Sequence, residues 1–270
     1  MTRIFDALRK AQATRAPAAP IGPVPVPPAP FPAGRAAAAR AAAARRVEGA
    51  DDPRLAVVPF TARVTLPEDV MREMTALRVS LEVGLVERMP RTVMFASSQR
   101  GEGTTTVAVQ FAAALACDDR LRVLLVDAHA RRPALDAGAA PAAGPSGAEL
   151  AALPPGADGP AARNLDLLPL SEEQRRAGIL VAAAVRECLE ALAGGYDWIV
   201  LDGPPVLESP DAVSLAAVAD GVIVVVRAGR TKRPVLARSV DLLRRAGARV
   251  LGSVLNRRRL EIPEFIYRRI

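Results

Sequence analysis

The sequence has few of the residues that mark disulfide-bonded, metal-thiolate or base-stacking proteins. Only 3% of its 270 residues are aromatic, and it contains two cysteines and one histidine. Cys117 and Cys188 stand alone, without a CxxC pair or a spaced histidine, so we expect buried reduced thiols rather than a disulfide or a zinc site. Lysine is equally scarce, with only Lys10 and Lys232. Because aromatic rings are rare, the core must be built from Leu, Val, Ile and Ala.

Long apolar runs are also missing. No stretch approaches the roughly 18 apolar residues of a membrane helix, and the chain does not open on a hydrophobic signal peptide. We therefore expect a cytoplasmic protein.

The formal charge of +7 is unevenly distributed. Residues 1–50 carry eight basic and two acidic side chains, so six of the seven net charges lie there, and Arg257 to Arg269 form a second basic end. No aromatic residues interleave these arginines, which argues against nucleic-acid binding. Attraction to an acidic protein or to the inner face of the plasma membrane, as a peripheral protein, fits better. The alternative that residues 1–50 are a solvated arm without a partner is not excluded by the sequence.

The composition divides the chain into three parts. Residues 1–12 place Ile4, Phe5, Leu8 and Ala11 on one face of a short amphipathic helix. Residues 13–54 are rich in Ala, Pro and Arg and are predicted to be a disordered linker, because almost none of them can form a core. The folded domain is expected over residues 55–270.

Within this domain, apolar strands alternate with helices. We expect strands at 92–98, 122–128, 165–170, 196–205, 221–229 and 249–256, and helices at 67–86, 105–116, 179–193 and 234–246. Strands that are apolar throughout are typical of a parallel sheet covered on both faces. The pattern predicts an α/β fold with a doubly wound, mostly parallel sheet flanked by helices.

Ligands of such sheets bind at the carboxyl ends of the strands. The first strand ends in SSQRGEGTTT, where a glycine turn and a helix N-terminus offer backbone N–H groups to a phosphate. The next strong strands end at Asp127 and Asp202. The candidate nucleotide-binding residues are Gly101, Glu102, Gly103, Thr104, Thr105 and Thr106; the candidate Mg²⁺ ligands are Thr105, Asp127 and Asp202, with both aspartates as the candidate catalytic residues.

These motifs, with VLLVDAHARRP, YDWIVLDGPPV, DAVSLAAVADGVIVVVRAGRT and VLGSVLN, resemble the bacterial tyrosine kinases of capsule and exopolysaccharide assembly. That family belongs to the P-loop ATPases, which include the cell-division and partitioning ATPases. MTRIFDALRKAQ is similar to the start of stand-alone cytoplasmic members. The resemblance implies ATP or ADP with Mg²⁺ as cofactor, and a membrane polysaccharide chain-length determinant as partner. An active kinase paralogue or further copies of the chain are the other implied partners.

The chain departs from this family at its phosphate-transfer residues. Thr104 stands where the family loop, GEGKS or GEGKT, has its lysine, and His129 stands where the motif DADxRRP has its second aspartate. The tyrosine cluster near the C-terminus is reduced to Tyr267, the one candidate autophosphorylation site there, and Arg78 alone matches the ring-assembly helix. These losses predict a degenerate kinase that acts as a regulator or adaptor, with weak or lost nucleotide binding.

Other interpretations stay open. An active kinase would need a substitute cation, for which Arg100, Arg131 and Lys232 are candidates, whereas a partitioning ATPase is disfavoured by SSQRGEG and RRP. His129 is either a replacement base or, as we favour, a side chain tolerated after the carboxylate lost its use. Arg131 and Arg132 either hold phosphate or pair with Glu102.

Overall fold

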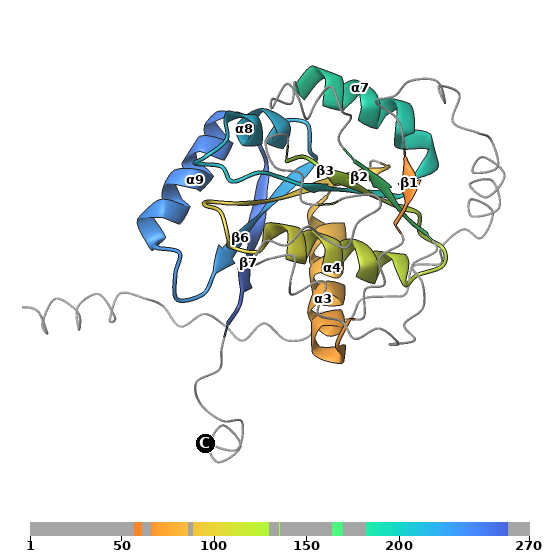
Figure 1. Cartoon of the computed structure of the whole chain (residues 1–270), viewed down its shortest axis with the longest axis horizontal. Coiled ribbons are helices and arrows are strands. Elements are labelled where there is room, and N and C mark those ends of the chain that lie inside the picture. The colour runs from red at the N-terminus through yellow and green to blue at the C-terminus, as the bar shows by residue number, and fades with distance from the viewer. Residues whose placement is uncertain are drawn as a thin grey trace, which may run out of the picture. The chain divides into compact units, whose positions relative to one another are not determined.

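The computed structural model describes residues 57–60, 66–85, 89–129, 135, 164–169 and 182–258. These residues form a seven-stranded sheet with helices on both of its faces (Figure 1). The predicted N-terminal helix and linker, and Tyr267, lie outside the described residues. None of the described helices is both long and apolar enough to cross a membrane.

The strand order across the sheet is β1-β4-β3-β5-β2-β6-β7. β1 pairs with β4 in the antiparallel direction, and every other neighbouring pair is parallel. The strands are β1 (Val58–Pro59), β2 (Arg91–Ser97), β3 (Val123–Asp127), β4 (Leu165–Leu168), β5 (Trp198–Asp202), β6 (Gly221–Arg227) and β7 (Val250–Asn256). The predicted mostly parallel sheet is confirmed. The short strand β1 was not predicted, because two residues carry no readable periodicity.

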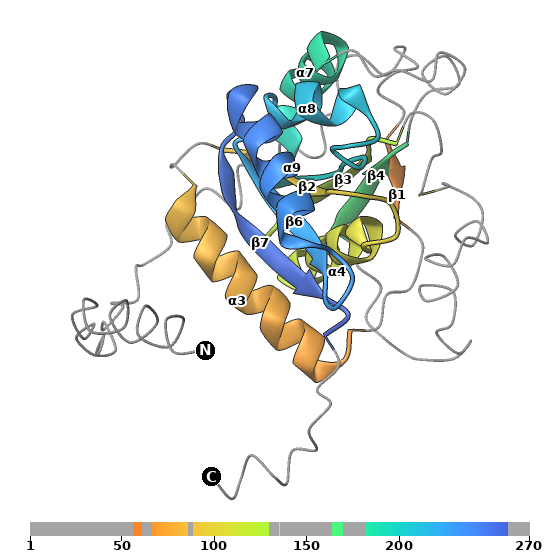
Figure 2. The ribbon, with the colours of Figure 1, turned by 90° about the vertical axis from the view of Figure 1, so that its left-hand side faces the viewer.

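The helices divide between the two faces of the sheet. α3 and α4 cover one face, and α7, α8 and α9 cover the other (Figures 1 and 2). The helices are α3 (Glu68–Gly84), α4 (Thr104–Ala116), α7 (Ala182–Leu192), α8 (Pro210–Ala216) and α9 (Arg233–Arg245), with a short 3-10 turn at Ala193–Gly195. α8 was not assigned from the sequence, since its seven residues span only two turns.

The central strands bury both of their faces, because successive side chains point to opposite sides of a sheet. In β2, Val93 and Phe95 belong to the core beneath α3 and α4, whereas Met94 and Ala96 belong to the core beneath α7, α8 and α9. Four of the five described aromatic residues, Phe60, Phe95, Phe111 and Trp198, lie in the first of these cores. The Phe111 ring lies 5.3 Å from that of Phe95 and 5.8 Å from that of Trp198, between ring centroids.

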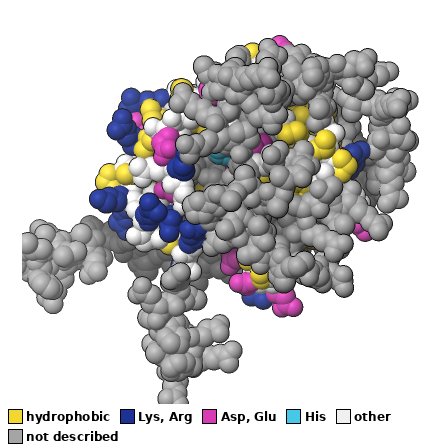
Figure 3. Space-filling model, in the orientation of Figure 1, with side chains coloured by type: hydrophobic (Ala, Val, Ile, Leu, Met, Phe, Trp, Pro, Cys, Tyr) yellow, Lys and Arg dark blue, Asp and Glu magenta, His cyan; other side chains and the backbone are white. Residues whose placement is uncertain are grey.

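Basic side chains gather on the side of the protein where α9 lies (Figure 3). The exposed members in and just before this helix are Arg230, Lys232, Arg233, Arg238, Arg244 and Arg245. We call this set the α9 basic surface. Asp241, paired with Arg245 at 2.8 Å, is the one acidic residue of the helix. The sequence did not reveal this surface, because the charges of the domain nearly balance when they are counted along the chain.

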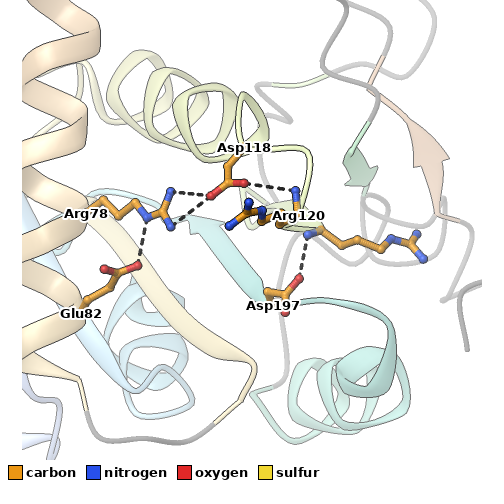
Figure 4. Close-up of polar contacts among 6 residues, drawn as sticks. Arg78, Glu82, Asp118, Arg120 and Asp197 are labelled. Atoms are coloured by element: carbon orange, nitrogen blue, oxygen red, sulfur yellow. Dashed lines mark hydrogen bonds and ion pairs between the residues drawn. The ribbon is translucent and has the colours of Figure 1, made fainter. Parts of the chain in front are cut away.

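Arg78 joins α3 to the end of α4 (Figure 4). Its guanidinium lies 2.9 Å from the Glu82 carboxylate and 3.4 Å from that of Asp118. Asp118 also accepts the backbone N–H of Arg120. Arg78, the side chain that matches the ring-assembly motif of the family, therefore forms ion pairs within its own chain.

The two cysteines differ in exposure. Cys188 is buried on α7, as expected, but Cys117 is exposed, so the prediction of a buried thiol at that position is wrong. Cys117 follows the last residue of α4, Ala116. Helical periodicity cannot indicate burial past the point where a helix ends.

Candidate functional site

The carboxyl ends of β2, β3 and β5 meet at one edge of the sheet, as the sequence predicted. Asp127 and Asp202 are paired residues of the neighbouring strands β3 and β5, and Phe95 of β2 pairs with Asp202 on its other side. Paired residues of adjacent strands point to the same face of a sheet. The two carboxylates therefore lie side by side, and both are fully buried.

The loop between β2 and α4 has the backbone shape of an anion cradle. Gly101 and Gly103 have φ of +80° and +93°, in the left-handed region that favours glycine. Gly103 precedes the first helical residue, Thr104, and no side chain caps the helix. The first N–H groups of a helix have no acceptor inside it and can bind an anion. The N–H groups of the first turn of α4, including those of Thr105 and Thr106, are thus suited to bind an anion.

The Glu102 carboxylate stabilises the loop through hydrogen bonds to the backbone of the same loop. Its buried carboxylate accepts the backbone N–H groups of Ser98 at 2.8 Å and Gln99 at 3.2 Å, and the Thr231 hydroxyl donates to its other oxygen. Arg131 and Arg132, the cationic partners considered for Glu102, lie outside the described residues. Glu102 thus has three hydrogen-bond donors without them, and its role is to shape the loop.

Two side chains that support this loop were not identified from the sequence. The Asn256 amide donates to the Glu102 carbonyl at 2.9 Å, and the Arg227 guanidinium donates to the Gly101 carbonyl at 3.3 Å. Arg227 ends β6 and Asn256 ends β7. Both are polar residues that follow apolar strands, as Asp127 and Asp202 do. Ligands of parallel sheets bind at the carboxyl ends of the strands. A search of every strand end for polar residues would have identified Arg227 and Asn256.

The close fit of Asn256 over Gly103 leads to a stability prediction. A Cβ at position 103 would overlap the Asn256 amide nitrogen, so Gly103→Ala must displace that side chain as well as strain the backbone. We expect a loss of about 2 to 3 kcal/mol in the free energy of unfolding, from backbone strain and a lost hydrogen bond. Urea unfolding measures it.

Gly101→Ala is the matched control. Gly101 has a similar φ, but a Cβ added there would have no atom within 4 Å, so backbone strain of about 1 to 2 kcal/mol is the whole expected cost. Equal losses for the two variants would show that the contact with Asn256 is unimportant.

His129 lies between the two buried carboxylates. Its Nδ1 is 3.2 Å from Asp127 Oδ1 and 3.5 Å from Asp202 Oδ2. Asp127 also accepts the backbone N–H groups of His129 and Leu135, each at 2.9 Å. Asp202 differs: within the described part of the chain, neither of its oxygens has a hydrogen-bond donor in normal geometry, although the Thr105 hydroxyl is near enough to lower its pKa.

The charges of this cluster depend on one another. Burial raises the pKa of Asp202 to about 6; the nearby His129 opposes this shift and Asp127 adds to it. Burial lowers the pKa of His129, but the charges of Asp202 and Asp127 together raise it by more, to about 9. At neutral pH the imidazole is therefore protonated, and its positive charge balances the buried carboxylates.

The donors of this cluster do not match those of a magnesium site. Mg²⁺ takes oxygen ligands in a near-ideal octahedron at about 2.0 to 2.1 Å. Here an imidazole nitrogen faces both Asp127 and Asp202, in the space between the carboxylates. The second aspartate of the family motif would supply oxygen where His129 supplies nitrogen.

Thr104 stands at the position of the loop lysine of the family. Thr104 is the buried first residue of α4, and it brings no charge to the cradle. Two of the candidate substitute cations are described. Arg100 is more than half exposed and lies 3.8 Å from Glu208, and Lys232 is exposed at the start of α9. The third candidate, Arg131, lies outside the described residues.

Comparison with known proteins finds similarity to bacterial tyrosine kinases and to a polysaccharide transport protein. It is 27% identical over 189 residues to the tyrosine-protein kinase YwqD of Bacillus subtilis, a match that covers 68% of this chain and 79% of YwqD. The homologues of this chain are bacterial tyrosine kinases. It is also 30% identical over 177 residues to the succinoglycan biosynthesis transport protein ExoP of Rhizobium meliloti, covering 62% of this chain and 22% of ExoP. No model of a protein family matches the chain.

Among solved structures, the kinase domain of the Escherichia coli tyrosine kinase ETK has the same fold. It superposes with a TM-score of 0.53 at 22% sequence identity, over 72% of this chain and 79% of that domain. This likeness confirms the predicted doubly wound α/β fold.

Proposed function

We propose that this chain is a catalytically degenerate relative of the bacterial tyrosine kinases, which acts as a regulator or adaptor in exopolysaccharide or capsule assembly. The observation that carries the proposal is the state of the strand-end site. Thr104 brings no cation to the phosphate cradle, and the His129 imidazole faces the two buried carboxylates. The surrounding fold, in contrast, is that of the kinases.

Phosphoryl transfer depends on positioning and on neutralising the charge of the transferred group. Without the loop lysine, the β- and γ-phosphates lose their main side-chain cation. With nitrogen in place of carboxylate oxygen at residue 129, the site also loses an acceptor for the proton of an attacking hydroxyl. The backbone N–H groups of the loop still suit a phosphate, so we expect weak binding of ATP or ADP with little benefit from Mg²⁺.

An adaptor acts through binding surfaces rather than through catalysis, and this chain has one candidate binding surface. The α9 basic surface suits an acidic partner or the acidic inner face of a membrane. The basic segment of residues 1–54 would add to this attraction. A membrane chain-length determinant is the partner that such a protein would engage, and the similarity to ExoP, a polysaccharide biosynthesis transport protein, supports this assignment.

The alternative, a working kinase with a substitute cation, finds less support. Arg227 is the described arginine that contacts the loop, but its guanidinium donates to the Gly101 carbonyl. Arg100 pairs with Glu208 at the surface. Neither is free to replace a lysine that reaches the β- and γ-phosphates.

A phosphorylation assay with the purified full-length chain tests the proposal. Incubated with γ-labelled ATP and Mg²⁺ or Mn²⁺, it should incorporate at least about 100-fold less phosphate than YwqD assayed in parallel, since losing one transition-state contact alone costs that much. The Tyr267→Phe variant identifies labelling at that tyrosine. Robust labelling of Tyr267, or of an added partner, would show that the chain is an active kinase.

A further inference from the structure

We propose that Asp127, His129 and Asp202 form a binding site for a divalent transition-metal ion of the Zn²⁺ class. This inference goes beyond the proposed function, because the ion would bind without nucleotide and without a phosphoryl-transfer step. It assigns a ligand to the residues that replace the magnesium site of a kinase.

Two of the three distances between donors match those of a tetrahedral site. Ligands at about 2.0 to 2.1 Å from a tetrahedral Zn²⁺ lie about 3.3 Å from one another. His129 Nδ1 lies 3.2 Å from Asp127 Oδ1 and 3.5 Å from Asp202 Oδ2. One donor atom from each of the three residues lies within 4.8 Å of the other two. Small side-chain rotations, with release of the proton from the His129 imidazole to solvent, would bring all three to bonding distance of one ion.

Asp202 supplies a second, independent observation. Its carboxylate is fully buried, yet among the described residues no donor makes a hydrogen bond of normal geometry to either oxygen. Buried polar atoms nearly always have a partner, and an orphaned one needs an explanation. A bound cation would provide it, since its bond to Asp202 replaces the missing donors.

The backbone prepares Asp127 for the same role. Asp127 Oδ2 accepts the N–H of Leu135, and Oδ1 accepts the N–H of His129. Hydrogen bonds of this kind orient the ligands of metal sites and tune their affinity. Both aspartates also sit on paired positions of adjacent strands, so the sheet holds them rigidly.

The imidazole decides which ion fits. Imidazole nitrogen suits zinc, cobalt, nickel and copper, whereas magnesium prefers oxygen ligands. Two carboxylates and one imidazole are three protein ligands, which leave a fourth tetrahedral position for water. The exchange of aspartate for His129 therefore changes the preferred metal rather than simply removing a metal site.

Cobalt titration of the full-length protein tests this assignment. The titration requires chelator-treated protein with the Cys117→Ser substitution, because the exposed thiol at that position would bind metal by itself. One Co²⁺ per chain should bind and give the intense visible absorption of tetrahedral cobalt, and Zn²⁺ should displace it. Calorimetry with Mg²⁺ alone should show affinity at least about 100-fold weaker than for Zn²⁺.

Variants locate the site. His129→Gln and Asp202→Asn should each weaken Zn²⁺ binding by more than about 100-fold, since even outer residues of metal sites contribute 10- to 100-fold. Glu190→Gln, which alters an exposed carboxylate on α7, should leave binding unchanged. His129→Asp should shift the preference toward Mg²⁺. Circular dichroism checks that each variant folds.

Three results would overturn the proposal: no cobalt complex of one ion per chain, Zn²⁺ binding unchanged in folded His129→Gln, or Mg²⁺ binding as tight as Zn²⁺. The first would mean that the charged imidazole itself neutralises the carboxylates. The cobalt spectrum of the unaltered site decides the question even where a variant fails to fold. The phosphorylation assay is a separate measurement, so failure of the proposed function would be distinguishable.

Discussion

Replacing Thr104 with lysine should raise the affinity of the chain for ATP by about one to two powers of ten. The residue is the first of α4, at the end of the helix where backbone N–H groups suit a phosphate. A charge-assisted hydrogen bond from an ammonium group contributes about 1.5 to 3 kcal/mol. Thermal-shift titrations with ATP and ADP, with and without Mg²⁺, measure the change.

Thr104→Gln is the matched control, because glutamine adds reach but no charge, and we expect nucleotide affinity to stay near that of the unaltered chain. Turnover should not return in Thr104→Lys, since His129 still occupies the place of the second aspartate. The double variant Thr104→Lys with His129→Asp tests whether the rest of the site can support phosphorylation. If Thr104→Lys leaves binding unchanged or weaker, the loop does not act as a cradle in solution.

Phe111→Ala should lower the free energy of unfolding by about 3 to 5 kcal/mol, the usual cost of truncating a buried aromatic ring. Phe111 is fully buried in α4, and its ring packs against those of Phe95 and Trp198. In a chain with 3% aromatic residues, this cluster is the largest concentration of ring contacts beneath α3 and α4. Denaturant unfolding followed by circular dichroism measures the loss.

Two controls bracket this effect. Phe111→Leu keeps most of the buried apolar volume and should cost clearly less than Phe111→Ala. Val83→Ala alters a side chain that is 85% exposed on α3 and should change stability by no more than about 0.5 kcal/mol. A loss below about 1 kcal/mol for Phe111→Ala would mean that α4 is not held by this cluster.

The sequence by itself determined the architecture and the departures from a kinase. Apolar strands such as residues 221–227 and the helix after Gly103 are readable because their signals are local periodicities and turn residues. The replacement of lysine by Thr104 and of aspartate by His129 is also readable, because both lie within continuous motifs. Local patterns fail where an element is as short as β1, or where a helix ends, as at Cys117.

Only the tertiary structure decided how the site is built. The pairing of Asp127 with Asp202 depends on the register of two strands that are more than 70 residues apart, which no local pattern encodes. The position of His129 against both carboxylates depends on the same register. The contacts of Arg227 and Asn256 with the loop depend on the pairing of β6 with β2 and β7. That no described residue donates a hydrogen bond of normal geometry to Asp202 could be seen only in the folded chain, because hydrogen bonding of a buried atom is a property of its surroundings.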